Sequence, residues 1–230
     1  MKKVLLIFGA DGALGSGVTK VLSSKDYDKI HLFDFKFKDK TEDAKIAKHI
    51  IKDLSIQENV KETFAAVKSD KNTAFFLFTT VGGFAGGSRI WESDVDEWDK
   101  MMQMNLNTSY QIARYFAILV KNSHSGSICF TTAFTGLHPE AGKAAYGTSK
   151  AALVHFVKTL AEEGNAINLS ANAIAPYILD TPANRSWMKD ANYDSWMKPD
   201  EIAELINSLF NNYYFVTGNI ITMNHRFSIT

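Results

Sequence analysis

The chain has 230 residues, 46% of them hydrophobic, and its 25 basic side chains balance 25 acidic ones, so the formal net charge is zero. This length suits one α/β domain with a substantial core, and a neutral chain lacks the positive field with which proteins hold nucleic acid or an anionic membrane. The single cysteine, Cys129, excludes an internal disulfide framework and is expected in the core. No apolar run is long enough for a signal peptide or for the ~18 residues of a membrane span, so we expect a cytoplasmic protein.

The first expected element is a buried strand at residues 4–8 that runs directly into a glycine-rich turn. Gly9, Gly12 and Gly15 fall within seven positions, and helical periodicity follows them. Five uninterrupted apolar residues are typical of a strand inside a parallel sheet. Glycines at its carboxyl end let a phosphate approach the backbone and meet the N–H groups of the helix start. The pattern therefore predicts a dinucleotide-binding turn, although it also suits a βα turn without a ligand.

Strands and helices then alternate along the rest of the chain, with no repeat or linker between them. We expect further strands at residues 29–34, 46–51, 73–81, 126–132, 169–174 and 216–223, and helices at residues 57–67, 98–120, 144–163 and from Pro199 onward. This alternation predicts an α/β fold with a Rossmann-type doubly wound parallel sheet of about seven strands, in a single domain over residues 1–230. The ligand crevice should lie over the carboxyl ends of the strands.

Two acidic residues follow strands at that edge of the sheet. Asp34 comes about 20 residues after the glycine turn, where a carboxylate can accept hydrogen bonds from both hydroxyls of an adenine ribose and repels a 2′-phosphate. We therefore expect NADH to be preferred, with NADPH possible because Lys36 and Lys38 are close by; a solvated acid at a strand end is the alternative. Asp53 could contact the adenine edge or act as a helix N-terminal acid before Ser55.

The expected chemistry lies in Tyr146 and Lys150, which are four residues apart on a predicted helix. Residues at this spacing share one helix face, so the ammonium can lie near the phenol. A neighbouring cation favours the phenolate and lowers the tyrosine pKa from ~10, which suits proton transfer near neutrality. The same spacing also suits an ordinary surface pair.

With these residues in place, the sequence resembles the short-chain dehydrogenase/reductase family along nearly its whole length. The resemblance implies an NAD(P)H-dependent oxidoreductase of a small molecule, with Tyr146 and Lys150 as the catalytic pair. It also implies a homodimer formed through the helices at residues 98–120 and 144–163. The histidine spacing offers no metal site, and we expect no nucleic-acid or membrane partner. The cofactor-binding positions implied by the resemblance are Gly9, Asp11, Ala13, Leu14, Gly15, Asp34, Asp53, Leu54, Gly82, Gly83, Lys150, Pro176 and Thr181.

One departure from the family pattern bears directly on the substrate. Thirteen residues before Tyr146, where the family usually has a serine, this chain has Ala133. Thr131 and Thr132 precede it, but neighbours along a strand point to different faces, so neither is assumed to replace the serine. That serine normally holds a carbonyl or alcohol oxygen. Its absence suggests an inactive protein or a substrate that is reduced at something other than a ketone.

Two segments resemble a pterin-reducing branch of the family. They are Gly-Gly-Phe-Ala-Gly-Gly at 82–87 and Leu-Asp-Thr-Pro-Ala-Asn-Arg at 179–185. The resemblance implies hydride transfer from NADH to a quinonoid dihydropterin, with the proton donated by Tyr146 directly or through water. Such a substrate is a conjugated imine, which has less need of a carbonyl-holding serine. The implied substrate-side residues are Phe84, Ala133, Tyr146 and Asn184.

Several alternatives stay open at this stage. Phe84 could stack on a flat substrate or anchor its own loop. Asn105 could hold a water in a proton relay or bond the helix backbone. A reductase of small carbonyl compounds would need Thr131, Thr132 or Asn105 to hold the oxygen. The third alternative is a dinucleotide-binding regulator without turnover. It would account for the missing serine but not for the presence of both Tyr146 and Lys150.

Overall fold

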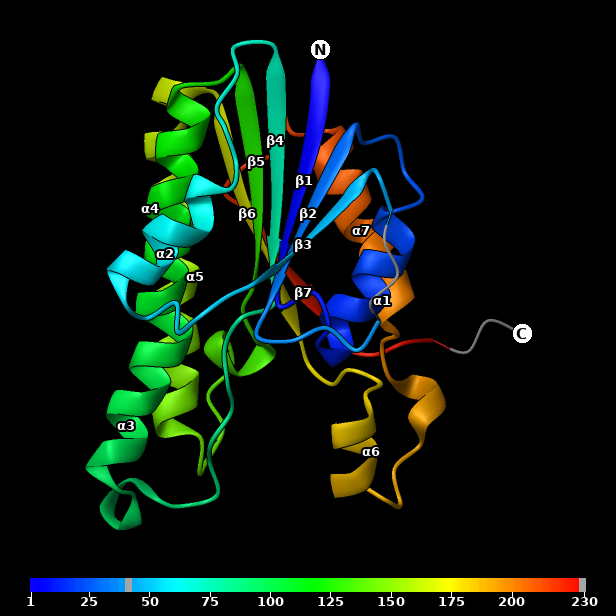
Figure 1. Ribbon diagram of the computed structural model, residues 1–230. Coiled ribbons are helices and arrows are strands. Elements are labelled where there is room, and N and C mark those ends of the chain that lie inside the picture. Colours follow the sequence, from blue (N-terminus) through cyan, green and yellow to red (C-terminus); the bar gives the residue numbers. More distant parts are fainter. Residues whose placement is uncertain (40–42, 228–230) are drawn as a thin grey trace.

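The fold is a seven-stranded sheet covered by helices on both faces (Figure 1), seen in a computed structural model that describes residues 1–39 and 43–227. The strand order is β3-β2-β1-β4-β5-β6-β7, and every neighbouring pair is parallel. The strands are β1 (Lys2–Phe8), β2 (Lys29–Asp34), β3 (Ile46–Ile50), β4 (Thr73–Thr79), β5 (Ser125–Thr131), β6 (Leu169–Pro176) and β7 (Ile220–Met223). The predicted doubly wound α/β fold is confirmed.

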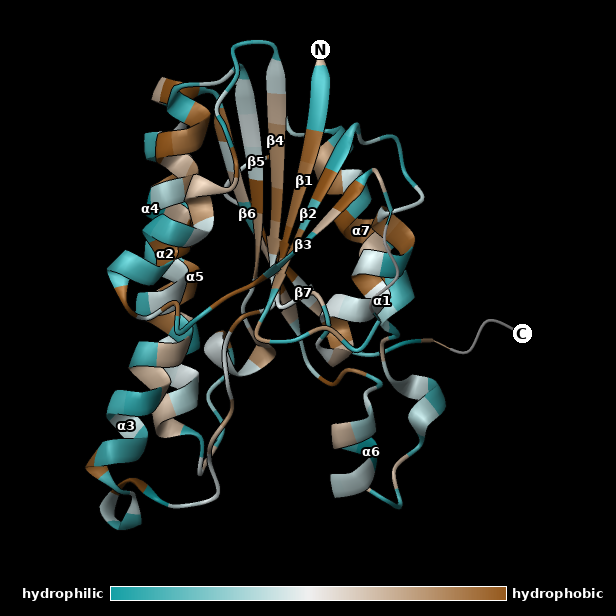
Figure 2. Cartoon of the chain, in the orientation of Figure 1, coloured by the Kyte–Doolittle hydropathy of each residue, from teal (hydrophilic) through white to brown (hydrophobic). Residues whose placement is uncertain are grey.

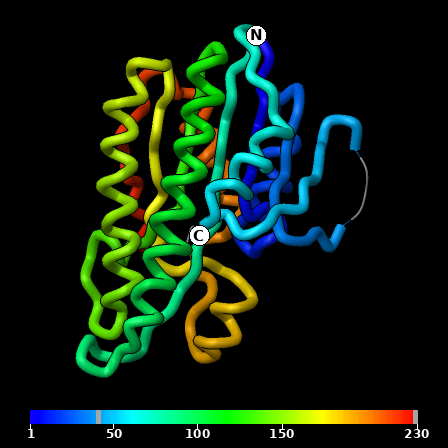
Figure 3. The backbone as a smooth tube through the Cα atoms, turned by 60° about the vertical axis from the view of Figure 1, so that its left-hand side comes forward, coloured from blue at the N-terminus to red at the C-terminus, as the bar shows by residue number. Residues whose placement is uncertain are grey.

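The helices form two layers, one on each face of the sheet. α1 (Ala13–Leu22) and α7 (Pro199–Asn211) cover one face, and α2 (Gln57–Ala65), α4 (Thr108–Lys121) and α5 (Ala144–Gly164) cover the other. Two shorter helices, α3 (Val95–Met101) and α6 (Pro182–Trp187), project beyond the carboxyl ends of the strands (Figures 1 and 3). The carboxyl ends of the strands are therefore flanked by α3 on one side and by α6 on the other.

Strand β4 shows why this chain forms a covered sheet. All seven of its residues are buried, and its side chains alternate between the two core layers: Phe75 and Leu77 pack with α4, whereas Phe76 and Phe78 pack with α1 and α7. A strand that is apolar on both faces loses hydrophobic stabilisation wherever one face meets water. The central strands accordingly form the most hydrophobic part of the chain (Figure 2).

The predicted helix at residues 98–120 is longer and less regular than expected. It begins at Val95, because the side chain of Asp94 accepts a hydrogen bond from the N–H of Asp96 and caps the helix. A π-helical segment, Met102–Asn107, then separates α3 from α4. Such segments often occur at functional sites, and this one contains the fully buried Asn105.

Smaller differences occur near the carboxyl terminus. The last strand was expected from residue 216 but begins at Ile220, because the chain first turns through Gly218, whose φ is 75°. The sixth strand was expected to stop before Pro176 but includes it as the final residue, and a proline at a strand end need not donate to the ladder. Cys129 is fully buried, as expected. No helix in residues 1–39 and 43–227 is both long and apolar enough to cross a membrane.

Candidate active site

The glycine turn joins β1 to α1 and presses the start of the helix against the turn backbone. Gly9 has φ 77°, a conformation that a side chain would strain. A Cβ on Gly15 would overlap the carbonyl oxygen of Gly9, whereas a Cβ on Gly12 would lie 3.3 Å from the same oxygen. Gly15 is therefore required by the close approach of helix and turn, and Gly12 is not.

The first turn of α1 has the features of an anion site. Gly12 provides no capping side chain, and the turn contains no acidic residue. The N–H groups of Ala13, Leu14 and Gly15 precede the first intrahelical hydrogen bond, which Ser16 donates to Gly12, so they are free to donate to a ligand. Unpartnered donors and the positive end of the helix dipole fit the pyrophosphate of a dinucleotide.

Asp34, at the end of β2, is connected to the glycine turn. One of its carboxylate oxygens accepts from the N–H of Asp11 at 2.8 Å, and the other accepts from the N–H of Phe35 at 2.7 Å. A carboxylate has about four acceptor positions, so capacity remains for ribose hydroxyls. Lys38 lies beside this site, with its ammonium 4.0 Å from the carboxylate of Asp11.

Asp53 is engaged in the turn that leads into α2. Its carboxylate accepts from the N–H of Ser55 at 2.9 Å, and its carbonyl accepts from the side chain of Asn59 at 2.8 Å. These bonds make Asp53 part of the turn before the helix. The helix itself begins at Gln57 after Ile56, and the acidic residue of its first turn is Glu58, so the expected role of Asp53 as a helix N-terminal acid is not supported. Leu54, next to it, is buried.

Asn105 connects the loop after β4 to α5. Its Oδ1 accepts from the N–H of Gly83 at 2.9 Å, and its Nδ2 donates to the Gly83 carbonyl at 3.1 Å and to Ser149 Oγ at 3.0 Å. A Cβ on Gly82 would lie 2.5 Å from Asn105 Oδ1 and 3.3 Å from Lys150 Nζ. Glycine is therefore needed at Gly82, and the Asn105 side chain is committed to backbone and α5 rather than to a substrate oxygen.

Tyr146 and Lys150 share the inner face of α5, as predicted, but their electrostatics differ from the prediction. Lys150 is buried, its ammonium donates to the carbonyl of Thr131 at 2.9 Å, and it lies 6.0 Å from the centre of the Tyr146 ring. Burial lowers the pKa of Lys150 to about 8. Burial, with the charge of Glu140, raises the pKa of Tyr146 to about 12. The expectation that Lys150 lowers the tyrosine pKa is thus wrong for this structure, because desolvation outweighs the distant cation.

The two hydroxyls nearest Ala133 are already used. Thr131 Oγ1 donates to the carbonyl of Thr79 at 2.9 Å, and Thr132 Oγ1 donates to the carbonyl of Ile174 at 2.8 Å. Both bonds join neighbouring strands and fix these side chains within the sheet. Ala133 itself is 5% exposed and offers only a methyl group.

Aromatic rings gather beside Tyr146. The ring of Phe84 lies edge-to-face with Tyr146 at 5.0 Å and with Trp187 at 5.9 Å between centroids. Phe84 is 48% exposed and Trp187 is 73% exposed, so both still present apolar surface to the crevice edge. The loop after β4, helix α5 and helix α6 therefore meet in one cluster, which we call the aromatic cluster: Phe84, Tyr146 and Trp187.

An ion pair borders this cluster. Lys143 donates to Glu140 at 2.7 Å, and its ammonium lies 6.0 Å from the centre of the Phe84 ring. Thr135 also donates to Glu140, at 2.6 Å. Sequence reasoning missed this pair and gave Trp187 no individual role; the only signal in the sequence was an acid and a base three residues apart before the catalytic helix.

The segment after β6 is held together by its own polar groups. Thr181 caps α6 by accepting from the N–H of Asn184 at 3.2 Å, and the side chain of Asn184 donates to the carbonyl of Leu179 at 2.9 Å. Arg185 pairs with Asp180 at 2.6 Å. Pro176 ends β6 at the crevice edge. Asn184 thus organises its segment, and its amide nitrogen does not point freely toward a substrate.

The expected residues fall into two groups around one crevice edge. The glycine turn, Asp34 and the Gly82–Gly83 loop follow β1, β2 and β4, whereas the aromatic cluster, Ala133 and Lys150 surround the ends of β5 and β6. Among the described residues, no group of three or more histidine, cysteine, aspartate or glutamate side chains could hold a metal ion.

Comparisons with known proteins agree with this geometry. The short chain dehydrogenase family profile matches residues 3–192. Dihydropteridine reductase of Dictyostelium discoideum is 32% identical over 206 residues, covering 89% of this chain and 86% of that protein. The 3-oxoacyl-[acyl-carrier-protein] reductase FabG of Chlamydia muridarum is 24% identical, with 97% and 96% covered. Among solved structures, ElxO with NADP bound superposes with a TM-score of 0.85 at 20% identity, covering 97% of this chain and 98% of that one.

Proposed function

The chain belongs to the short-chain dehydrogenase family, and on that premise we propose that it reduces a quinonoid dihydropterin to the tetrahydropterin with NADH. Membership makes it an oxidoreductase that uses a nicotinamide dinucleotide. Its relatives include both a dihydropteridine reductase and reductases named for carbonyl substrates. The choice between these substrates therefore depends on the residues around the tyrosine.

The observation that supports a pterin is the aromatic cluster beside Ala133. A flat heterocycle can pack against Phe84 and Trp187, which are 48% and 73% exposed, while the edge of its ring meets the Tyr146 hydroxyl. A ketone oxygen would instead need a donor at position 133, and Ala133 has none. The aromatic cluster thus favours a planar, ring-shaped substrate over a small carbonyl compound.

The proposed reduction needs one hydride and one proton. NADH supplies the hydride when it is bound. With its pKa raised to about 12, Tyr146 holds its proton at neutral pH and is therefore a donor rather than a base. Transfer of this proton to a pterin nitrogen leaves a phenolate, which the Lys150 ammonium stabilises once the phenol is charged.

Lys150 is well placed to respond to that charge. Its pKa of about 8 means that it is protonated at neutral pH, although its burial makes the ammonium costly. The carbonyl of Thr131 holds it at the end of β5, on the crevice side. We propose that Lys150 also bonds the nicotinamide-side ribose from this position, as the family resemblance implies.

A preference for NADH is part of the proposal. The carboxylate of Asp34 stands at the end of β2 and would repel a 2′-phosphate. Lys38 is the basic residue that could favour such a phosphate, but Asp11 already lies 4.0 Å from its ammonium. A neighbour in structure was solved with NADP, but its 20% identity supports the fold alone.

A reductase of small carbonyl compounds is the second candidate. It is favoured by the relatives named for such substrates, including the carbonyl reductase of Xenopus tropicalis at 22% identity. It requires Thr131, Thr132 or Asn105 to hold the substrate oxygen, and all three donate to other groups.

One assay distinguishes the candidates. NADH oxidation is followed with a chemically generated quinonoid dihydropterin and, separately, with a panel of ketones, for the unaltered chain and for Ala133→Ser. We expect turnover with the pterin alone, and a change of less than about threefold in that rate for Ala133→Ser, because no carbonyl oxygen needs holding. Ketone turnover without pterin turnover would overturn the proposal, and no turnover with either would indicate a protein without catalysis.

We also propose that the chain forms a homodimer through α4 and α5, which run side by side on one face of the sheet (Figure 3). Tyr110 and Ile118 of α4 are 48% and 47% exposed, and Tyr110 contacts the half-buried Phe156 of α5 at 5.8 Å between ring centroids. Apolar groups on this helix face would be covered in a dimer. Light scattering should give a mass of two chains for the unaltered protein and a mass of one chain for Ile118→Arg.

A further inference from the structure

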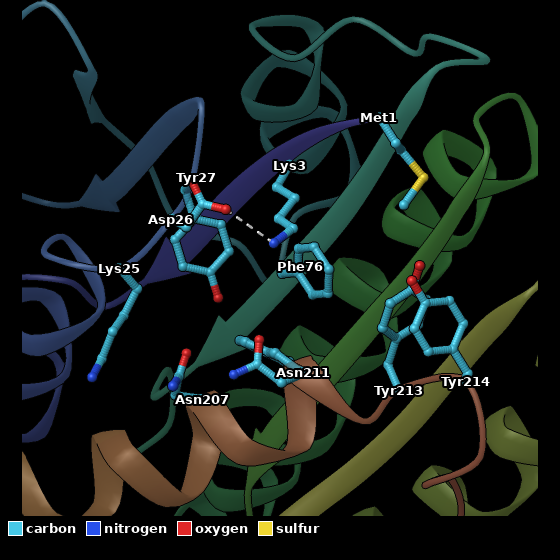
Figure 4. A pocket seen from close by; sticks show the side chains of 11 residues that line it. Met1, Lys3, Lys25, Asp26, Tyr27, Phe76, Asn207, Asn211, Tyr213 and Tyr214 are labelled. Atoms are coloured by element: carbon cyan, nitrogen blue, oxygen red, sulfur yellow. Dashed lines mark hydrogen bonds and ion pairs between the residues drawn. The ribbon is translucent and has the colours of Figure 1, made fainter.

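A second cavity lies far from the glycine turn, at the amino ends of the strands (Figure 4). It holds about 300 Å³ and is bounded by the start of β1, the residues before β2, strand β4 and helix α7. Cavities of this size are at the lower end of small-molecule sites. Because substrate and dinucleotide meet at the opposite ends of the strands, this cavity is separate from the candidate active site.

The inner wall of the cavity is aromatic. Phe76 meets Tyr27 at 5.8 Å, Phe210 at 5.4 Å and Tyr213 at 5.3 Å between ring centroids, and the contact with Tyr213 is perpendicular. All four rings are at most 7% exposed, so they are fixed by packing. Aromatic edges and faces of this kind favour a flat ring in contact with them.

The Tyr27 hydroxyl is the unusual group in this wall. Tyr27 is 7% exposed, and its hydroxyl bonds to no residue within 1–39 and 43–227. In Figure 4 the hydroxyl points across the cavity toward Asn207 and Asn211. Tyr213, in the same wall, instead shares a 2.9 Å hydrogen bond with Ser125. The Tyr27 hydroxyl therefore opens into the cavity, where it can exchange a hydrogen bond with a group that enters.

Two carboxamides face this hydroxyl from α7. The side chains of Asn207 and Asn211 line the cavity, and neither bonds to another described residue. Each carboxamide offers two donors and one acceptor oxygen. Three neutral groups that can both donate and accept therefore converge on one cavity.

The charged residues at the rim cancel one another. Lys3 pairs with Asp26 at 3.3 Å, and Lys25 pairs with Glu204 at 2.7 Å. Neither an anion nor a cation would find an unpaired opposite charge in these two pairs. These two pairs therefore leave no unpaired side-chain charge at the rim for an ionised ligand.

We propose that this cavity binds a neutral, flat molecule of one or two rings with a cyclic amide at its edge. The aromatic wall formed by Tyr27, Phe76 and Tyr213 contacts the ring. The amide N–H and C=O pair with the Tyr27 hydroxyl and with the carboxamides of Asn207 and Asn211. Such a ligand matches the donors and acceptors that these three side chains present to the cavity.

The test uses 2-quinolone, a neutral two-ring cyclic amide, as the probe with the isotope-labelled full chain. Amide spectra recorded at increasing probe concentration should show saturable shifts for the side-chain amides of Asn207 and Asn211. Tyr27→Phe keeps the ring and removes only the hydroxyl. It should weaken probe binding roughly three- to tenfold, because one hydrogen bond to the ligand is lost, and should leave the melting temperature unchanged, because this hydroxyl bonds to no other described residue.

Three controls make the outcome decisive. Naphthalene, which lacks the amide, and 2-naphthoate, which is charged, should bind at least tenfold more weakly than 2-quinolone. Saturating NADH should not displace the probe, because the glycine turn lies at the other end of the sheet. The proposal is overturned by absent shifts, by shifts that NADH abolishes, by equal binding of naphthalene, or by a Tyr27→Phe variant that melts several degrees lower and binds the probe unchanged.

Discussion

The two halves of the candidate active site are built differently. In the nucleotide half, the turn after β1 meets the end of β2 through its backbone: the Gly9 N–H donates to the Phe33 carbonyl at 2.9 Å, and the Asp11 N–H donates to the Asp34 carboxylate. The start of α1 in turn packs closely on the Gly9 carbonyl. In the substrate half, side chains from three distant segments meet: Phe84, Tyr146 and Trp187. The nucleotide half tolerates few residue types, because its closely packed backbone leaves no space for a side chain at Gly15. In the substrate half, substitution of the exposed aromatic side chains can alter which substrate is accepted.

This difference assigns separate roles to the halves. Backbone donors at a helix start recognise a phosphate whatever the reaction, so the nucleotide half should determine cofactor affinity. Side chains near the reacting atoms should determine turnover and substrate choice. Changes in one half should therefore leave the property of the other nearly intact, and each prediction below tests that separation.

The largest effect is expected for Tyr146→Phe, which removes the proposed proton donor and keeps the ring in the aromatic cluster. Turnover should fall by about 10²- to 10⁴-fold, the range typical of a lost general acid. NADH affinity, measured by fluorescence titration, should change less than about twofold. Tyr214→Phe, which is 71% exposed after α7 and far from the candidate active site, is the matched control and should keep full turnover. Undiminished turnover of Tyr146→Phe would remove the tyrosine from the mechanism.

The converse effect is expected for Gly15→Ala in the nucleotide half. Its added methyl would overlap the Gly9 carbonyl, so turn and helix must separate. Overpacking of this kind costs about 1–3 kcal/mol, and we expect NADH affinity to fall roughly ten- to hundredfold. Gly12→Ala places its methyl 3.3 Å from the same oxygen and should be mild. Equal losses for the two variants would show that the close approach does not matter.

The sequence predicts the nucleotide half well for a physical reason. A buried strand, a glycine turn and an acid about 20 residues later are local patterns, each confined to one or two elements. The parallel pairing follows from the alternation of strands and helices, because parallel strands need helical crossovers. Gly15 is required by a contact with a residue six positions earlier, so even this steric condition is local.

The substrate half depends on contacts that no local pattern contains. Phe84 and Trp187 are more than 100 positions apart in the chain, yet their rings meet. The π-helical segment that aims Asn105 at Gly83 interrupts a sequence with ordinary helical periodicity. The direction of the Tyr146 pKa shift differs from the prediction, because the spacing of Tyr146 and Lys150 says nothing about how deeply each side chain is buried.

The pH profile should identify which member of the catalytic pair titrates. Burial lowers the pKa of Lys150 to about 8, so the ammonium is present below that pH and lost above it. If the ammonium is needed, kcat/KM should fall about tenfold per pH unit above pH 8. Lys150→Arg keeps a positive charge at all accessible pH values. The kcat/KM of Lys150→Arg should be lower overall but should no longer fall above pH 8. If kcat/KM of this variant still falls above pH 8, another group is responsible for the titration.

Asp34 tests cofactor choice within the nucleotide half. Asp34→Asn removes the charge that would repel a 2′-phosphate and retains an oxygen to accept from the N–H of Asp11. The ratio of kcat/KM for NADH over NADPH should narrow about tenfold. Asp53→Asn, in the turn before α2, is the control and should leave that ratio unchanged. An unaltered ratio in Asp34→Asn would count against the ribose contact.

The smallest expected effect belongs to Phe84→Leu, and it separates ring recognition from chemistry within the substrate half. Aromatic pairs contribute about 0.5–1.5 kcal/mol beyond burial, so KM for the pterin should rise roughly three- to tenfold while kcat stays nearly constant. Phe215→Leu, which is 76% exposed after α7, should change neither constant. Because Phe84 lies against Tyr146 at 5.0 Å, a fall in kcat instead of a rise in KM would show that the ring positions the proton donor rather than the substrate.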